Sequence, residues 1–385
     1  MDKNILLSYL SGLSKELIEG CRVKADCGVS LFTPDGIASY NALWLRDFAY
    51  MTEYAGEFLT DEEVENCIRF SLEHKRADGW MPDRIYADGT AVYAAGEIGR
   101  PVGEANLDNT LFLIFSAYFY LNRIKTSDAC SLYRTWEQNL LNGLNAVPVS
   151  KRGLVYNDSR RPHSPYGFTD TVGKTGELLM ESLLYWRSCV MMSELNKKFG
   201  SVPLGIYSEK ADLIEKNMGT LYDGSRKVYL AATEDCRQID IWGNAYLLYI
   251  GFPVSEEVRR GILGFLKSQY SEYCYLGQIR HLPKGDYWTR MLIDIPREEY
   301  QNGAYWATAT GWVVWCLAQT DCILAARTLA RAVECFRTEG SFECVNEHYR
   351  KLNSFVVSAT NVYGAAKRLL QSEKNVEFSK ALQEI

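Results

Sequence analysis

The sequence lacks the residue patterns that build metal and nucleotide sites. It has only four histidines in 385 residues, with no HExxH motif, no paired-histidine spacing and no Cys/His cluster. A structural or catalytic transition metal is therefore not expected. No GxGxxG, Walker or GxSxG sequence occurs, which removes the usual evidence for dinucleotides, nucleoside triphosphates and serine-hydrolase chemistry. We expect chemistry that needs neither a metal ion nor a cofactor.

Long apolar runs and a basic charge excess are also missing. No stretch approaches the roughly 18 apolar residues of a membrane span, and the net charge of −6 disfavours nucleic acid and anionic membranes as partners. The eleven cysteines form no CxxC pair, and several lie in apolar helical stretches, which predicts reduced, buried thiols. Residues 1–20 lack the apolar core and cleavage site of a signal peptide. These features predict a cytoplasmic protein.

A repeat of short polar blocks is the most informative feature that the sequence does have. Six blocks rich in Trp, Asp, Asn, Gly and Thr recur roughly every sixty residues, and each runs into an apolar, helix-like segment. The blocks are WLRD at 44–47, LDNT at 107–110, FTDTVGKTGE at 168–177, DIWGN at 240–244, YWATATGW at 305–312 and SATN at 358–361. One helical hairpin with its loops fits this period. We therefore predict an all-α (α/α)6 toroid of six hairpins that occupies residues 1–385 as one domain.

Two kinds of helix alternate along the chain. Thr60 with Glu63, and Ser255 followed by Glu256, are start signals for amphipathic helices that would lie on the outside. The segments after the blocks are apolar nearly all round, as inner helices must be. If the inner helices run parallel, all six blocks meet at one mouth. We expect a site there, with short local strands in the loops 79–99 and 151–167.

The blocks are rich in carboxylates and aromatic rings, which is typical of carbohydrate sites. The carboxylates in or near them are Asp47, Asp108, Asp170, Asp240, Glu343 and Glu347, and the tryptophans include Trp44, Trp80, Trp242, Trp306 and Trp312. Sugar rings stack on aromatic faces, while carboxylates and arginine bind hydroxyl groups. Two carboxyl groups also suffice to cleave a glycosidic bond: one protonates the leaving oxygen and the other activates water or attacks carbon.

The motifs WLRD, FTDTVGKTG, YWATATGW, and EHY followed by NSFVVSATN resemble those of the inverting (α/α)6-barrel glycosidases. This six-hairpin clan includes glucoamylase, trehalase, the processing α-glucosidases and exo-α-mannosidases, and the motif order matches over almost the whole chain. The resemblance implies a hydrolase of carbohydrate metabolism that removes a terminal sugar from an α-glycoside, either a small oligosaccharide or another glycoside, with inversion. The YWATATGW block lacks the proline of the corresponding trehalase region, which argues against trehalase itself.

The resemblance also implies a catalytic pair. YGFTD, at 166–170, is similar to the stretch in which Gly-x-Asp supplies the general acid of trehalases and processing glucosidases, and this resemblance implies Asp170. The base of these families lies in a Glu-x-Tyr sequence, which here is EHY and indicates Glu347. Glu343, in FECV, is the alternative base, because trehalases also carry a Phe-Glu near this place. An inverting pair should lie about 6.5–9.5 Å apart, which leaves room for a water molecule.

The same resemblance assigns the walls of the sugar site. Arg46 and Asp47 are similar to the Arg-Asp pair that grips the hydroxyls of the terminal sugar, with Trp44 beside them. Further candidates for substrate contact are Asp108, Asn109, Asp240, Trp242 and Trp306. Structural roles compete with these assignments: Asp108, Asp170 and Asp240 could cap helices, the arginine and aspartate could form a buried ion pair, and the tryptophans could fill the core.

Other functions fit the same scaffold. A sugar epimerase or isomerase usually needs paired histidines, and only His163 and His348 lie near the blocks. A lyase or uronide-processing enzyme and a non-catalytic sugar-binding toroid are further alternatives. Many members of the clan carry an N-terminal β-sandwich domain that has no counterpart here, and its absence would either widen the site or leave an apolar patch on which a homo-oligomer could form.

Overall fold

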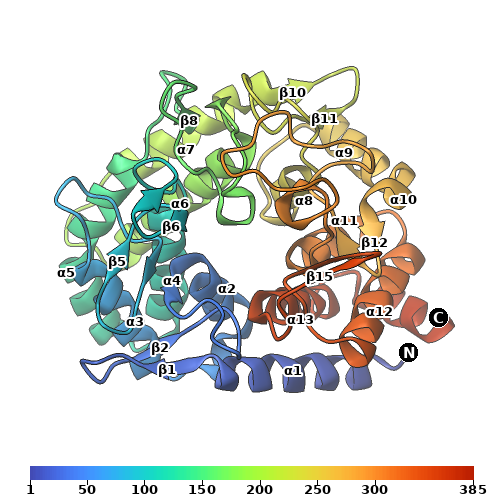
Figure 1. The fold of residues 1–385 in the computed structure, drawn as a ribbon, viewed down its shortest axis with the longest axis horizontal. Helices are drawn as coiled ribbons and strands as arrows, with labels where there is room; N and C mark the ends of the chain where they lie inside the picture. The colour runs from blue at the N-terminus through green and yellow to red at the C-terminus, as the bar shows by residue number, and fades with distance from the viewer.

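Six inner helices form a closed ring at the centre of the protein (Figure 1). The computed structural model describes residues 1–385. The inner helices are α2 (Leu45–Ala55), α4 (Asn109–Arg123), α6 (Leu179–Phe199), α8 (Ile241–Tyr249), α11 (Thr310–Ala318) and α13 (Val356–Leu370). Each contacts the next in this order, and α13 returns to contact α2. The predicted (α/α)6 toroid is therefore confirmed.

An outer layer of helices packs against this ring. Its members are α1 (Lys3–Gly20), α3 (Asp61–Glu73), α5 (Thr126–Ala146), α7 (Ile206–Asn217), α9 (Glu256–Ser268) and α12 (Cys322–Thr338), with the short α10 (Tyr270–Tyr273) and the terminal α14 (Asn375–Glu384) beside them. The predicted starts of two outer helices are correct. Thr60 and Glu63 form a complete capping box at α3, and the Ser255 side chain accepts from the Val258 N–H at 3.3 Å at α9.

Burial explains why the helices sort into two layers. Every residue of α8 is buried, as expected for a helix that is apolar on all sides. In α9 only Ile262, Leu263 and Leu266 are buried, and they lie on one face. A continuous core of 106 buried residues joins the two layers around the whole ring. No helix is both long and apolar enough to cross a membrane.

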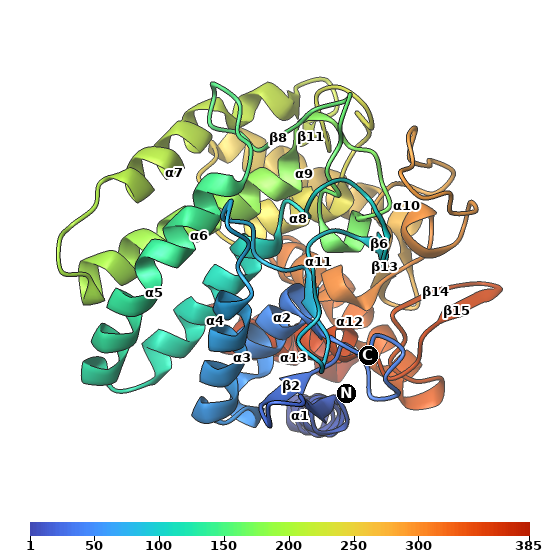
Figure 2. The same cartoon turned by 60° about the vertical axis from the view of Figure 1, so that its left-hand side comes forward.

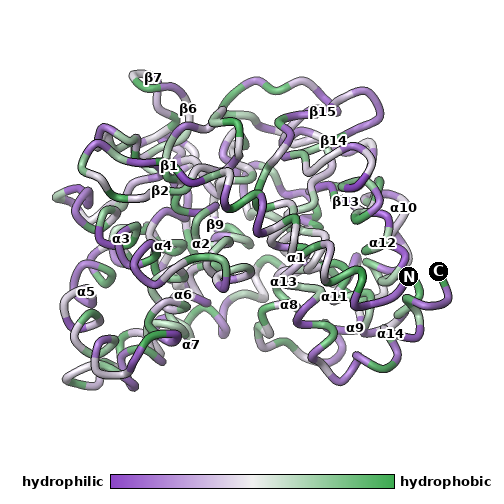
Figure 3. The backbone as a smooth tube through the Cα atoms, turned by 90° about the horizontal axis from the view of Figure 1, so that it is seen from below, coloured by the Kyte–Doolittle hydropathy of each residue, from purple (hydrophilic) through white to green (hydrophobic).

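The strands are short and lie in the loops at one side of the ring (Figure 3). They pair as β1 (Arg22–Lys24) with β2 (Ser30–Phe32), β6 (Gly96–Glu97) with β7 (Arg100–Pro101), β8 (Tyr156–Asn157) with β9 (Gly176–Glu177), β10 (Tyr222–Asp223) with β11 (Val228–Tyr229), β12 (Cys274–Tyr275) with β13 (Gln278–Ile279), and β14 (Cys344–Asn346) with β15 (Tyr349–Lys351). A three-stranded sheet joins β3 (Leu43–Trp44), β4 (Arg84–Ile85) and β5 (Ala91–Val92). Figure 2 shows the β14–β15 hairpin projecting beyond the helices. Strands do occur in both loops where the sequence predicts them.

The blocks lie where the inner helices begin, with one exception. WLRD leads into α2, LDNT into α4 and DIWGN into α8, and SATN lies in the first turns of α13. YWATATGW passes through a short 3-10 turn, η5 (Ala307–Ala309), before α11. The third block does not begin its helix directly. It forms another 3-10 turn, η2 (Gly167–Thr169), and then β9, so Asp170 lies in a loop that precedes α6.

Candidate active site

A narrow pocket opens at the mouth, between segments that are distant in sequence. It is lined by Pro34, Tyr40, Trp44, Arg46, Asp47, Gly167, Phe168, Asp170, Tyr300, Glu343 and Phe355. Its volume is about 40 Å³, equivalent to about three buried water molecules at 10–15 Å³ each. A pocket of this size has room for one sugar ring at most.

Asp170 forms one wall of the pocket. It directly follows η2 and is 8% exposed. The Gln301 side-chain amide donates to Asp170 Oδ1 at 2.8 Å, and its own oxygen accepts from the Thr171 N–H at 2.9 Å. Burial raises the Asp170 pKa to about 7, although the Arg46 charge and the Gln301 hydrogen bond oppose the rise. The carboxyl group is thus partly protonated at neutral pH and can act as a proton donor. It is not the N-cap of α6, since Leu178 occupies that position.

Arg46 lies behind Asp170 in a buried ion network. Its guanidinium donates to Asp83 Oδ1, and its Nε lies 3.6 Å from Asp108 Oδ2. The same Asp108 oxygen accepts from the Gly167 N–H at 2.7 Å. A Cβ atom at Gly167 would overlap the Arg46 side chain. Glycine is therefore required where η2 crosses the guanidinium, and this contact places the loop that carries Asp170.

Glu343 also lines the pocket and lies immediately before β14. It is 3% exposed, and the Tyr40 hydroxyl donates to its carboxylate at 3.0 and 3.1 Å. The Lys351 ammonium lies 2.9 Å from Glu343 Oε2 and 3.4 Å from the centre of the Tyr300 ring. Burial raises the Glu343 pKa, and the Lys351 charge and the tyrosine hydrogen bonds oppose this rise. The Cys344↔Lys351 pairing of the β14–β15 hairpin brings the lysine to the carboxylate.

Polar groups without a protein partner line the remaining wall. Asp47 is buried, and burial raises its pKa to about 8. Its Oδ1 atom and the Trp44 indole N–H have no hydrogen-bond partner within the protein. Buried polar atoms normally have partners, so a ligand that carries both donors and acceptors fits these positions. Hydroxyl groups meet that description.

The structure brings four of the predicted site residues to the pocket, namely Trp44, Arg46, Asp47 and Asp170. The preferred base, Glu347, is not among them. It is exposed in the turn of the β14–β15 hairpin and lines a different cavity. The alternative, Glu343, lines the pocket instead. The preference for Glu347 is thus corrected, because the EHY sequence forms a hairpin turn that carries Glu347 away from Asp170.

The other predicted polar contacts do not line the pocket and have structural roles. Asp108 supports Arg46 and Gly167 from behind. The Asn109 amide donates to the Met81 and Tyr93 carbonyls, both at 2.9 Å. The Asp240 side chain accepts from the Gly243 N–H at 2.9 Å and caps α8. For Asp240 the capping alternative is therefore correct.

The two predicted tryptophans are core residues. Trp242 stacks on His281 with ring centres 3.9 Å apart, and its N–H donates to the Ile279 carbonyl. The Trp306 N–H donates to the Tyr300 carbonyl. Both indoles are fully buried and neither lines the pocket, so their assignment to the substrate is corrected. No histidine lines the pocket either.

Neither a known protein family nor a curated protein matches the sequence. The fold nevertheless has solved counterparts: the chain shares its (α/α)6 toroid with structures of glycoside hydrolases. GH63 mannosylglycerate hydrolase from Thermus thermophilus, solved with glucose, matches with a TM-score of 0.66 and 14% identity over 92% of this chain and 99% of that one. A rhamnosidase from Klebsiella oxytoca with rhamnose bound matches with a TM-score of 0.63 and 13% identity over 95% of this chain and 63% of that one. The GH78 rhamnosidase of Bacillus sp. GL1 has a TM-score of 0.60 and 13% identity, covering 97% of this chain and 35% of that one.

Proposed function

We propose that the protein is an exo-acting glycoside hydrolase that removes one terminal sugar with inversion, with Asp170 as general acid and Glu343 as general base. The observation that carries the proposal is that Asp170 and Glu343, two of the three buried carboxyl groups that line one narrow pocket, come from distant segments. Their hydrogen-bond partners differ, which suits two different roles in one reaction.

Asp170 is suited to protonate the leaving oxygen. Burial keeps a substantial fraction of the group neutral near pH 7, and the Gln301 amide holds one carboxyl oxygen of this pocket-lining residue in place. Proton donation to the glycosidic oxygen stabilises the departing group as the bond to the anomeric carbon breaks.

Glu343 is suited to accept a proton from water. The Lys351 ammonium and the Tyr40 hydroxyl both favour its ionised form. A water molecule between this carboxylate and the anomeric carbon would be deprotonated as it attacks the face opposite the leaving group. That sequence inverts the configuration at the anomeric carbon.

The remaining wall of the pocket supports a terminal sugar as the part of the substrate that binds there. The unpartnered Asp47 oxygen and Trp44 N–H offer hydrogen bonds to hydroxyl groups, and Arg46 adds a positive charge at the same wall. Since the pocket has room for one ring at most, the scissile bond lies at its opening and the substrate is cut from its end. The bound glucose and rhamnose in two similar folds favour a hexose or deoxyhexose, which we propose is α-linked.

The test is hydrolysis of p-nitrophenyl α- and β-glycosides of glucose, mannose, galactose and rhamnose. Release from at least one of them is expected, and proton NMR of the first product should show the inverted anomer. On a disaccharide with the same terminal sugar, Asp170→Asn should lower kcat by about 10²–10⁴-fold. The matched control Asp240→Asn retains a side chain that caps α8 and should keep kcat within about threefold.

Two results would contradict the proposal. A retained anomer would replace inversion by a two-step reaction through a covalent intermediate. Sugar binding of equal affinity by the wild type and Asp170→Asn, with no turnover by either, would favour a non-catalytic sugar-binding toroid.

A further inference from the structure

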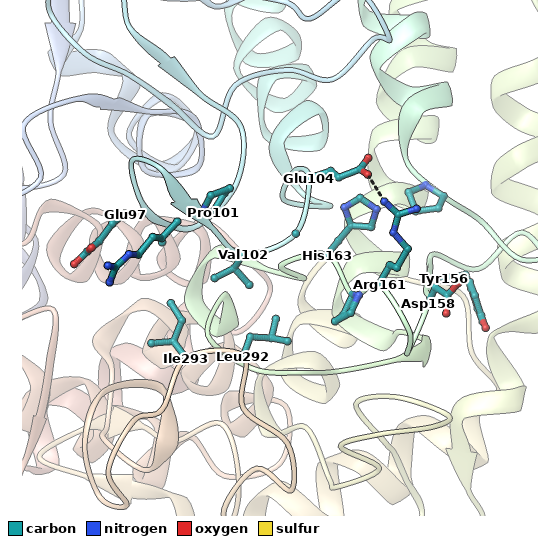
Figure 4. Close-up of a pocket in the computed structure, with 15 residues that line it drawn as sticks. Glu97, Pro101, Val102, Glu104, Tyr156, Asp158, Arg161, His163, Leu292 and Ile293 are labelled. Carbon is teal, nitrogen blue, oxygen red and sulfur yellow. Dashed lines mark hydrogen bonds and ion pairs between the residues drawn. The ribbon is translucent and has the colours of Figure 1, made fainter.

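A second, much larger cavity opens on the same side of the ring as the pocket. Its volume is about 1060 Å³. Three loops surround it: the β6–β7 hairpin, the segment around β8 from Pro148 to His163, and the residues Leu292 and Ile293 (Figure 4). It shares no lining residue with the pocket, and nothing in the proposed reaction yet uses it.

The large cavity adjoins the segment that carries Asp170. The Leu292 N–H donates to the carbonyl of Thr171, the residue after Asp170, at 2.7 Å. Ser164, which follows the cavity residue His163, donates through its hydroxyl to the Asp170 carbonyl at 2.7 Å. The segment from His163 to Asp170 therefore contributes to both, with His163 lining the cavity and Asp170 lining the pocket.

The proposed base and its partners do not adjoin the large cavity. Neither Glu343 nor its partners Tyr40 and Lys351 line the large cavity. In an inverting reaction the acid faces the leaving group, and the base faces the water on the opposite side of the ring. The position of the large cavity next to the acid segment, and away from the base, is that of a leaving-group site.

We propose that the large cavity binds the leaving-group part of the substrate, and that this part is an uncharged oligosaccharide of more than one ring. The proposal rests on the proposed function, because it names the substrate class of the same reaction. The cavity volume is at the upper end of ligand sites, which span about 300–1,000 Å³, and a single ring would leave most of it unfilled.

The charges on the cavity wall favour an uncharged ligand. Arg161 pairs with Glu104 at 3.3 Å, and both are exposed, while Arg100 and Glu97 come from opposite strands of the β6–β7 hairpin. Positive and negative side chains alternate here, so no field of one sign attracts an anionic group. Donors and acceptors are both available for hydroxyl groups, and Tyr156 lies at the rim with an aromatic face on which a ring can stack.

The experiment compares leaving groups of different length on one terminal sugar. The wild-type protein is assayed with the glycosyl fluoride of the sugar found above and with the di-, tri- and tetrasaccharide that end in it. The fluoride ion leaves without making contacts in the large cavity, so hydrolysis of the glycosyl fluoride tests only the pocket. We expect kcat/KM to rise at least tenfold from the disaccharide to the tetrasaccharide.

The double variant Tyr156→Ala and Arg161→Ala locates the effect. It should lower kcat/KM for the tetrasaccharide about tenfold and change that for the fluoride less than twofold. Arg226→Ala is the matched control, because Arg226 is also an exposed arginine with an acidic partner but lines neither the large cavity nor the pocket. Equal kcat/KM for all three oligosaccharides, or an equal loss on the fluoride, would overturn the leaving-group site. Failure to hydrolyse any glycosyl fluoride would instead overturn the proposed function on which it rests.

Discussion

The two walls of the pocket surround the same chemical group in different ways. Asp170 is held by a neutral amide from Gln301, whereas Glu343 is in direct contact with the Lys351 ammonium. Both are buried, and burial raises the pKa of both. The Arg46 charge opposes this rise at Asp170, and at Glu343 the Lys351 charge opposes it together with a direct ion pair. The comparison teaches that burial alone assigns no role to a carboxyl group, because the nearest partner decides which one stays ionised.

The largest expected effect is that of a substitution that tests Glu343 as the general base. Glu343→Gln should lower kcat by about 10²–10⁴-fold on the disaccharide and on the glycosyl fluoride, because water activation is lost for both. Asp170→Asn should impair mainly the disaccharide, since fluoride needs little protonation. Glu347→Gln is the control, because this side chain is exposed in the hairpin turn and should keep kcat within twofold. A larger loss for Glu347→Gln than for Glu343→Gln would reverse the assignment.

A smaller effect is expected from the support behind the acid wall. In Gly167→Ala the new methyl group would overlap Arg46, so the loop with Asp170 must shift. We expect a loss of about 1–3 kcal/mol in the free energy of unfolding, as for other overpacked sites, and at least a tenfold loss in kcat/KM. Urea unfolding monitored by circular dichroism measures the first quantity. Gly219→Ala has open space around its Cβ position and should change neither the free energy of unfolding nor kcat/KM. A Gly167→Ala protein with unchanged stability and activity would refute the close contact between Gly167 and Arg46.

The pH dependence of kcat/KM separates the two walls. Asp170 must be protonated, so activity should fall as the pH rises through about 7. Glu343 must be ionised, so activity should fall as the pH drops through its raised pKa. Lys351→Met removes the opposing charge, which raises the pKa of Glu343 further and should cost about tenfold in kcat/KM at pH 5. Lys351→Arg should restore the pH at which kcat/KM falls on the acidic side of the profile. A shift of the alkaline limb alone would contradict this role.

The smallest effect is expected at Gln301. Its amide stabilises the ionised form of Asp170, so Gln301→Met should raise the Asp170 pKa and move the alkaline limb to higher pH. We expect a two- to threefold gain in kcat/KM at pH 8 relative to each protein's optimum. The acidic limb should stay in place, because Gln301 does not contact Glu343. Movement of both limbs together would show that the walls are not independent.

Local patterns predicted the helices and part of the pocket. The apolar and amphipathic segments, the caps at Thr60 and Ser255 and the block spacing are properties of short stretches, and the ring follows from them. Arg46, Asp47 and Asp170 were also identified, because each lies in a recognisable motif. Gln301, Tyr40 and Lys351 carry no motif, and they join the site only through contacts between segments far apart in the chain.

The choice between Glu343 and Glu347 shows where sequence evidence ends. The amino-acid sequence by itself determined six apolar helices, their amphipathic partners and a set of carboxylates at the helix starts. Only the tertiary structure decided which carboxylates share a pocket, because two glutamates four residues apart lie on opposite ends of a hairpin strand. Only the tertiary structure distinguishes the proposed roles of these carboxylates as well, since the pKa of a buried carboxyl group depends on charges and hydrogen bonds that the fold brings to it from other segments.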